Sequence, residues 1–193
     1  MRKVFLSLVL GFFIVLYFSL TVFILPEKYL SNEQLVPQPY FEAILSDSEI
    51  SLGDSFRLSI VSENRGDYGD IHILSTAFPT LSEIEGTVEI VTYDFTQSSV
   101  RIDSGDEIGA KYSGGLESIT AKYPSIEAVN RPILPDAKNH LELLITPNES
   151  GIFTIYVKSI DIPHTNDKSH YPSSGILDHQ DEYVLDYSVN VNP

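Results

Sequence analysis

The strongest constraint on this chain is an uncharged apolar run close to its amino terminus. Residues 4–25 contain no Asp, Glu, Lys or Arg, and their only polar side chains are hydroxyls. As a helix these 22 residues would be about 33 Å long, enough to cross a hydrocarbon core of about 30 Å. Pro26 would end that helix. The run therefore predicts a transmembrane helix at residues 4–25.

A cleaved signal peptide is the alternative reading of the same run. The apolar part of a signal peptide spans about 7–15 residues and is followed by a small-residue cleavage motif. Here the run is longer and ends at Pro26 without such a motif, which favours an uncleaved signal anchor. Arg2 and Lys3 precede the run, and the positive-inside rule keeps residues 1–3 in the cytoplasm. We expect a single-pass protein of the cell membrane whose C-terminal domain is extracytoplasmic.

Composition narrows what the part outside the cytoplasm could do. The chain has no cysteine, which excludes disulfides, thiolate metal sites and cysteine nucleophiles. Twelve Lys and Arg oppose 27 Asp and Glu, giving a formal net charge of −15. Such a surface repels the phosphates of nucleic acids, so we expect no nucleic acid partner. It suits cations, basic partners or a salty medium.

The rest of the chain has the texture of a β protein. Residues 26–39 contain three prolines and are expected to form a linker. Beyond them, apolar and polar residues alternate in short runs that turn residues separate, and no helical period is sustained. Strands are predicted at residues 41–45, 56–61, 71–78, 88–95, 100–103, 141–145, 153–158 and 183–192. Residues 40–193 are therefore expected to form one all-β domain, a sandwich of about seven to nine strands.

Three segments are predicted to be irregular. Residues 104–138 are punctuated by glycines and prolines, and we expect an irregular insertion there with a short strand near 118–123. Residues 159–180 are expected to be a polar loop. In the turn at 64–70, Gly66 and Gly69 are available for positive φ angles.

Two stretches resemble a known family. Residues 50–66 place Gly53-Asp54 before an alternating strand and close it with Asn64-x-Gly66, and residues 141–158 place Pro147 four residues before Gly151 and a second alternating strand. In these features the chain resembles prokaryotic immunoglobulin-like cell-surface domains of the CARDB type, found in bacterial and archaeal envelope proteins. The resemblance implies an immunoglobulin-like sandwich with a role in adhesion, scaffolding or partner binding. The insertion at 104–138 departs from a minimal domain of this type.

The densest group of potential metal ligands lies between residues 161 and 182. Three of the five histidines fall within 16 residues there, among several acids. Imidazole with carboxylate suits Zn or Cu, whereas carboxylates alone suit Ca. The spacings match no standard metal motif, so a solvated polar loop is the plain alternative. The candidate ligands are His164, Asp167, His170, Asp178 and His179.

The sequence holds no recognisable catalytic motif. There is no Gly-x-Ser-x-Gly elbow, no cysteine and no phosphate-binding loop, so we expect no enzyme. The leading hypothesis is a membrane-anchored extracytoplasmic binding or scaffold module, whose partner is an envelope protein, a polysaccharide or a subunit of a membrane complex. The alternative is a metal-binding accessory subunit of a membrane enzyme that uses the loop at 161–182. A stand-alone hydrolase is disfavoured because nucleophile and base are missing.

One further motif concerns modification. Asn148-Glu149-Ser150 matches the acceptor sequence for N-glycosylation and falls in a predicted exposed turn. The predicted topology would make this turn accessible from outside the cell.

Overall fold

The computed structural model describes residues 2–19, 35–108, 119–163 and 168–193. It divides into two units, Met1–Leu35 and Val36–Pro193. The first unit contains helix α1 (Arg2–Ser19), along which large apolar side chains such as Leu8, Phe12 and Val15 are exposed. Residues 20–25 of the predicted transmembrane segment lie outside the described residues. Among the residues described, no helix combines the length and the apolar character needed to cross a membrane.

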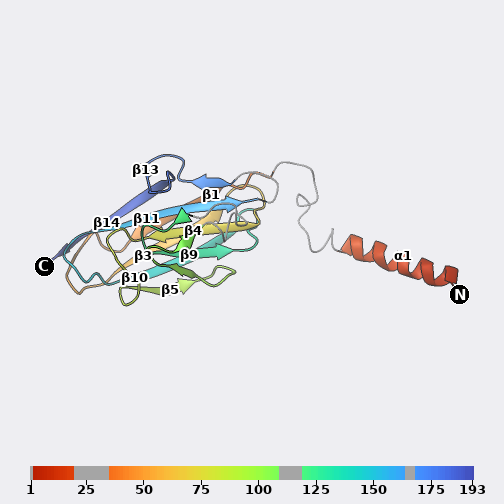
Figure 1. Ribbon diagram of the computed structural model, residues 1–193, viewed down its shortest axis with the longest axis horizontal. Coiled ribbons are helices and arrows are strands. Elements are labelled where there is room, and N and C mark those ends of the chain that lie inside the picture. Colours follow the sequence, from red (N-terminus) through yellow and green to blue (C-terminus); the bar gives the residue numbers. More distant parts are fainter. Residues whose placement is uncertain (1, 20–34, 109–118, 164–167) are drawn as a thin grey trace. The chain divides into compact units, whose positions relative to one another are not determined.

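The second unit consists of two main β sheets packed against each other (Figure 1). Sheet A holds, in spatial order, β1 (Pro39–Leu45), β3 (Phe56–Asn64), β10 (Lys138–Ile145) and β5 (Val88–Tyr93). Sheet B holds, in spatial order, β13 (Ile176–Leu177), β14 (Tyr183–Asn192), β11 (Gly151–Ile162), β4 (Ile71–Ala77), β9 (Ser125–Asn130) and β6 (Val100–Ile102).

Four short strands complete the described part of the chain. β12 (Ser169–Tyr171) pairs with β11, and β2 (Glu49–Ser51) pairs in parallel with β14. β7 (Glu107–Ile108) and β8 (Ile119–Thr120) form a separate ribbon. The remaining pairings are antiparallel, as expected when short turns join neighbouring strands.

The core lies between the two sheets and follows from alternation along the strands. In β3, Phe56, Leu58 and Ile60 are buried while the residues between them are more exposed. Phe56 meets Phe153 of sheet B edge to face, with ring centroids 5.7 Å apart. Burial of such side chains supplies most of the free energy of folding in a domain without disulfides. The predicted all-β class is found in the second unit.

The structure corrects the predicted strand map in two places. The insertion expected at residues 104–138 contains β9, an interior strand of sheet B whose six residues are all buried. Apolar and polar residues alternate in β9 only from Ser125 to Ala128, which is too short a run to stand out among the surrounding prolines and glycines. The polar loop expected at 159–180 is also wrong, because β11 continues to Ile162 and β12 and β13 follow. With these additions the described residues hold fourteen strands, more than the sequence indicated.

The role predicted for Gly66 and Gly69 is also wrong, since neither has a positive φ angle. A Cβ atom on Gly66 would instead collide with the carbonyl oxygen of Val36 and lie 2.6 Å from the nitrogen of Gln38. The backbone needs this close approach to form hydrogen bonds with residues 36–38, where Arg65 N–H donates to Gln38 at 2.8 Å. Residues 36–39, assigned to the linker, therefore belong to the second unit.

Candidate functional site

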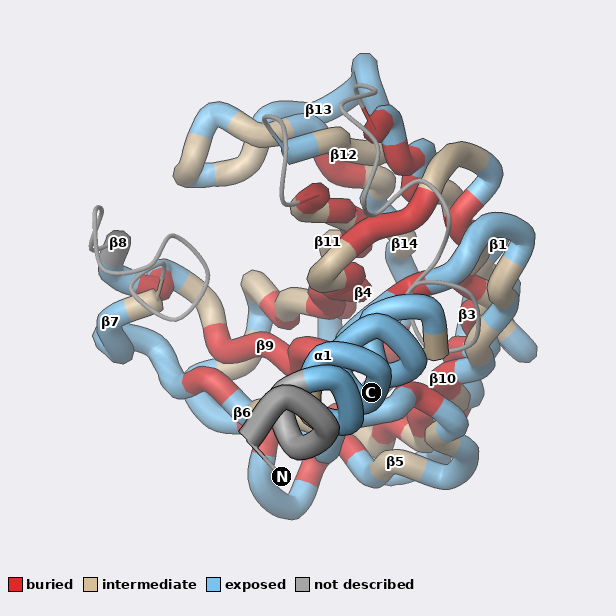
Figure 2. Tube along the Cα trace, turned by 90° about the vertical axis from the view of Figure 1, so that its right-hand side faces the viewer, coloured by how far each residue is buried: buried red, intermediate tan, exposed pale blue. Residues whose placement is uncertain are grey.

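The outer face of sheet B, the one turned away from the core, carries buried polar residues. Ser75 on β4 lies opposite both Glu127 on β9 and Lys158 on β11. All three are buried, although they alternate with core residues and so point away from the core. The outer face of a two-layer sandwich is commonly solvated, so burial here marks a covered surface. Figure 2 shows β7 and β8 on the β9 side of sheet B, and β12 and β13 on the β11 side.

We call the residues gathered on this face the polar cluster. They come from strands β4, β9, β11 and β12 and from the segment that joins β13 to β14. The members of the polar cluster are Ser75, Ser125, Glu127, Lys158, His170, Asp178, His179, Gln180 and Glu182.

Lys158 is the centre of the polar cluster. Its ammonium group donates to Asp178 at 2.6 Å, to Glu182 at 2.7 Å and to the side-chain oxygen of Gln180 at 3.0 Å. Three acceptors satisfy the three protons of a buried ammonium. Burial lowers the pKa of Lys158, but attraction to Glu182 and Asp178 outweighs it and leaves the pKa raised. Lys158 therefore stays charged.

The acids around Lys158 fasten the segment between β13 and β14 onto the sheet. Burial alone would raise the pKa of Glu182, but attraction to Lys158 and hydrogen bonds from Lys158 and Lys168 lower it to about 2. Asp178 also accepts hydrogen bonds from the backbone N–H groups of Gln180 at 2.8 Å and Glu182 at 3.1 Å. Asp178 thus fixes the conformation of the loop, and Asp178 and Glu182 together bind the loop to Lys158 on β11.

Glu127 is the second buried charge centre of the polar cluster. Its Oε1 accepts hydrogen bonds from the hydroxyls of Ser75 at 2.8 Å and Ser125 at 3.2 Å. Burial is the largest influence and raises the pKa of Glu127, against the opposing effect of the two serines and Lys158. Burial therefore disfavours the charged form of Glu127, while the two serine hydroxyls and Lys158 favour it.

Two histidines complete the polar cluster. His170 on β12 lies opposite Ile160, on the same face as Lys158. Burial lowers the pKa of both His170 and His179, so both are neutral at pH 7. His179 accepts a hydrogen bond from the backbone of Lys122 at 3.3 Å, and its ring meets Tyr123 edge-on at 5.6 Å. Together these groups offer many hydrogen bonds and an aromatic edge.

Three of the five predicted metal ligands fall in the polar cluster. His170, Asp178 and His179 are there, while His164 and Asp167 lie outside the described residues. Asp178 is already bound to Lys158. Within the described ranges, no three His, Asp or Glu side chains are placed to share a metal ion. The metal site therefore stays a prediction.

A second buried polar group joins the two sheets. The carboxylate of Asp161 (β11) lies 2.5 Å from Nδ1 of His72 (β4), whose Nε2 lies 2.7 Å from the hydroxyl of Ser62 (β3). This is the order of groups in a serine hydrolase triad. All three residues are fully buried, so Ser62 has no surface on which to meet a substrate. We call Ser62, His72 and Asp161 the inter-sheet relay, a chain of hydrogen bonds that links the two sheets within the core.

The sequence analysis missed the inter-sheet relay, although the alternation of inward- and outward-facing residues along the strands contains a signal for it. Ser62 continues the inward series of Phe56, Leu58 and Ile60 along β3. The sequence predicts Asp161 in a polar loop, but Asp161 continues the inward series of β11 and is fully buried. A polar residue in phase with core residues needs a buried partner.

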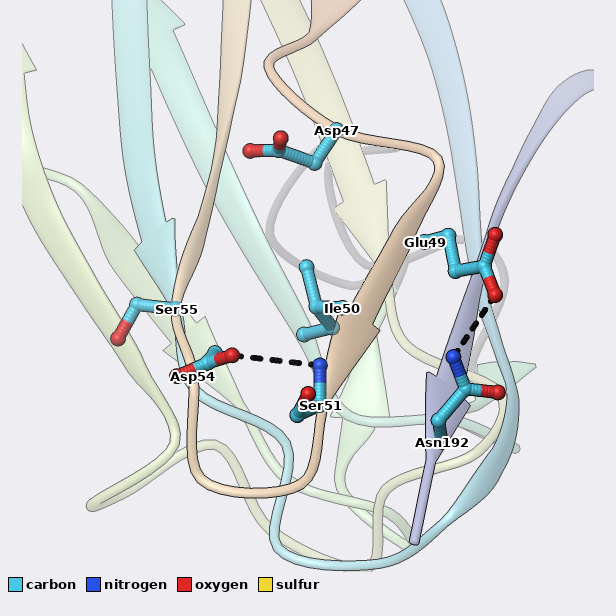
Figure 3. A pocket seen from close by; sticks show the side chains of 7 residues that line it. All are labelled: Asp47, Glu49, Ile50, Ser51, Asp54, Ser55 and Asn192. Atoms are coloured by element: carbon cyan, nitrogen blue, oxygen red, sulfur yellow. Dashed lines mark hydrogen bonds between the residues drawn. The ribbon is translucent and has the colours of Figure 1, made fainter.

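A hollow near the C-terminal end of β14 gathers further acids (Figure 3). Asp47, Glu49 and Asp54 line it, but each carboxylate is directed differently. Asp54 accepts from the backbone N–H of Ser51 at 3.3 Å, and Glu49 accepts from Asn192 at 2.8 Å. This arrangement explains the loop conformation and does not converge on a ligand.

The chain has distant likenesses among solved structures. No protein family model matches the chain, and no curated protein matches it. Among solved structures, a cohesin module of a Clostridium perfringens family 33 glycoside hydrolase has a TM-score of 0.39 at 13% identity, covering 82% of this chain and 98% of its own. The CARDB domain of a Pyrococcus furiosus protein, in complex with di-metal ions, has a TM-score of 0.37 at 9% identity, covering 84% and 92%.

A third likeness is to a β-glucosidase from Listeria innocua, with a TM-score of 0.38 at 12% identity, covering 81% of this chain and 16% of that one. At these scores none of the likenesses carries an argument about function. The resemblance to CARDB-type domains thus has a structural counterpart only at a distance.

Proposed function

We propose that this chain is a membrane-anchored extracytoplasmic module that binds a component of the cell envelope through the polar cluster and performs no catalysis. The observation that carries the proposal is the gathering of Glu127, Lys158, His170, His179 and Glu182 on one face, each with a shifted pKa. Shifted titratable groups concentrate at functional sites.

The chemistry of the polar cluster favours a partner recognised by hydrogen bonds. Burial lowers the pKa of both imidazoles and so favours their neutral form, the ammonium of Lys158 is matched by carboxylates, and Glu127 accepts hydrogen bonds from two serines. Lys122 and His179 at its rim are exposed, and Tyr123 is half-buried. A polysaccharide, an envelope protein or a subunit of a membrane complex would each present suitable groups.

The anchor part of the proposal rests on the amino-terminal segment. Residues 4–25 are uncharged, and the apolar side chains described along α1 are exposed rather than packed into a core. Apolar surface of this extent is stable in lipid and unfavourable in water. Protease added to intact cells should remove a C-terminal tag, and the protein should stay in the membrane pellet after carbonate washing.

Binding is tested by changing the rim of the polar cluster without touching Lys158. Replacing both Tyr123 and His179 by Ala in the full chain should reduce recovery of the native partner at least tenfold in pull-downs from envelope extracts. His140→Ala, on the exposed face of sheet A, is the matched control and should leave recovery unchanged. Equal recovery with both variants would reject the polar cluster as the binding face.

One observation also supports the metal-binding alternative. The buried Nε2 atom of His170 has no hydrogen-bond partner in the part of the chain that the structure describes. The positive charges of Lys158 and Lys168 oppose a cation there. Untagged full-length protein with stoichiometric Zn or Cu, lost in a His170→Ala variant and kept in His140→Ala, would favour this alternative.

A further inference from the structure

The turn between β10 and β11 presents the Asn-Glu-Ser motif to solvent. β10 ends at Ile145 and β11 begins at Gly151. Between them Pro147 is buried, whereas Asn148, Glu149 and Ser150 are all exposed.

Hydrogen bonds hold the base of this turn, where Thr146 lies. Thr146 accepts or donates a 2.7 Å hydrogen bond with the hydroxyl of Ser55, and its N–H donates to Thr87 at 2.9 Å. In contrast, no hydrogen bond from another described residue engages the side chains of Asn148 or Ser150. Both functional groups of the motif are therefore available to an external enzyme.

The turn lies at the end of the sandwich far from where the chain enters it. Lys138, at the start of β10, pairs with Glu63 beside the turn that binds residues 36–38, and Ile145 at its other end pairs with Phe56. Eight extended residues separate the two ends, which is about 25 Å at the usual rise along a strand. The tip therefore stands clear of the entry segment.

We propose that Asn148 is an N-glycosylation site, modified with an oligosaccharide from a lipid-linked donor by the host's oligosaccharyltransferase. The side-chain amide nitrogen of Asn148 forms a bond to the anomeric carbon of the donor's first sugar. The bond from that carbon to the donor phosphate breaks, the phosphate leaves with the bonding electrons, and the amide gives up one proton. No oxidant or reductant is required.

Asn148 is the only asparagine of the chain that is followed by Ser or Thr at the second position, so the chain offers one site to test. One feature beyond the turn supports this assignment. Large apolar side chains are exposed at the same end of the sandwich, including Ile152 at 68% and Leu52 at 45%. A bulky hydrophilic glycan on the turn would shield such surface. The proposal rests on the extracytoplasmic location given under the proposed function.

The test uses full-length protein with a C-terminal tag, purified from membranes of its own host. Mass spectrometry of the peptide containing Asn148 should show a glycan mass on the wild-type protein and on Ser150→Thr, which keeps the motif. The glycan should be absent from Asn148→Gln and from Ser150→Ala. Because these side chains are exposed, the variants should fold like the wild type.

Recovery of the wild-type peptide wholly unmodified would overturn the proposal. Protease treatment of the same intact cells separates this failure from failure of the proposed function. A tag that protease removes, together with an unmodified Asn148, rejects glycosylation alone. A tag that the protease does not remove rejects the extracytoplasmic location, and the glycosylation proposal is then rejected too because it rests on that location.

Discussion

Replacing Lys158 by Met is the sharpest single test of the polar cluster. Methionine keeps most of the apolar stem and removes only the ammonium group. Asp178 and Glu182, which both bind that ammonium, would then face each other at the edge of sheet B without their shared cation.

The structure sets the size of the expected effect. Removing one partner from a buried ion pair costs about 3–5 kcal/mol, because the remaining charge stays buried and unpaired. Here the side chains of Asp178 and Glu182 are 6% and 15% exposed, and Lys168 still binds Glu182. We therefore expect the lower end of that range, a loss of about 3 kcal/mol in the free energy of unfolding.

Urea unfolding of the full-length protein in mild detergent at pH 7, followed by the near-ultraviolet signal of its tyrosines, measures this loss. Lys138→Met is the control, because Lys138 is 58% exposed and lies 3.3 Å from Glu63. Such a surface pair contributes less than about 1 kcal/mol. If Lys158→Met cost no more than the control, the ammonium would not be holding the loop, and the account of the polar cluster would be wrong.

Three further predictions concern Glu182, the inter-sheet relay and Gly66. The pKa of about 2 for Glu182 lies below its ordinary 4.5, so its stabilisation is full above about pH 4.5 and falls as acid protonates it. Because Glu182 is partly solvated, we expect its protonation to lower the free energy of unfolding by about 2 kcal/mol as the pH falls. This loss should be smaller in Lys158→Met. Asp161→Asn should cost about 2 kcal/mol in urea unfolding and speed amide exchange in β4 and β11, because His72 loses a charged acceptor; no change in exchange would refute the relay. Gly66→Ala should lower the free energy of unfolding by about 1–3 kcal/mol, since its Cβ would collide with the backbone of residues 36–38. Limited proteolysis should then cleave residues 36–38 faster than in the wild type, and an unchanged cleavage rate would refute this prediction.

The alternation of inward- and outward-facing residues along the strands made the fold partly predictable. Along β3, β11 and β14 one face meets the core and the other meets solvent or loops, so apolar and polar residues alternate and the strands were located. β9 escaped because its alternation is short, from Ser125 to Ala128, and lies within a stretch interrupted by prolines and glycines. The short strands β2, β7, β12 and β13 escaped because two or three residues are too few to show an alternation.

The candidate site was less predictable because it is made by tertiary pairing. Asp178 is a candidate metal ligand in the sequence, yet its partner is Lys158, twenty residues away. His179 instead accepts a hydrogen bond from the backbone of Lys122. Nothing in the sequence marks Lys158 as buried, since it occupies an outward position on β11. Its burial arises because a loop folds back over the outer face of sheet B.

The most direct measurement of the binding proposal is site-specific photo-crosslinking in intact cells. A photoreactive residue replacing His179 tests the polar cluster, and one replacing the exposed His140 on sheet A serves as the control. We predict one dominant adduct, to an envelope protein or polysaccharide, from position 179 and none from position 140. An adduct from position 140 alone would place the binding face on sheet A and contradict the account.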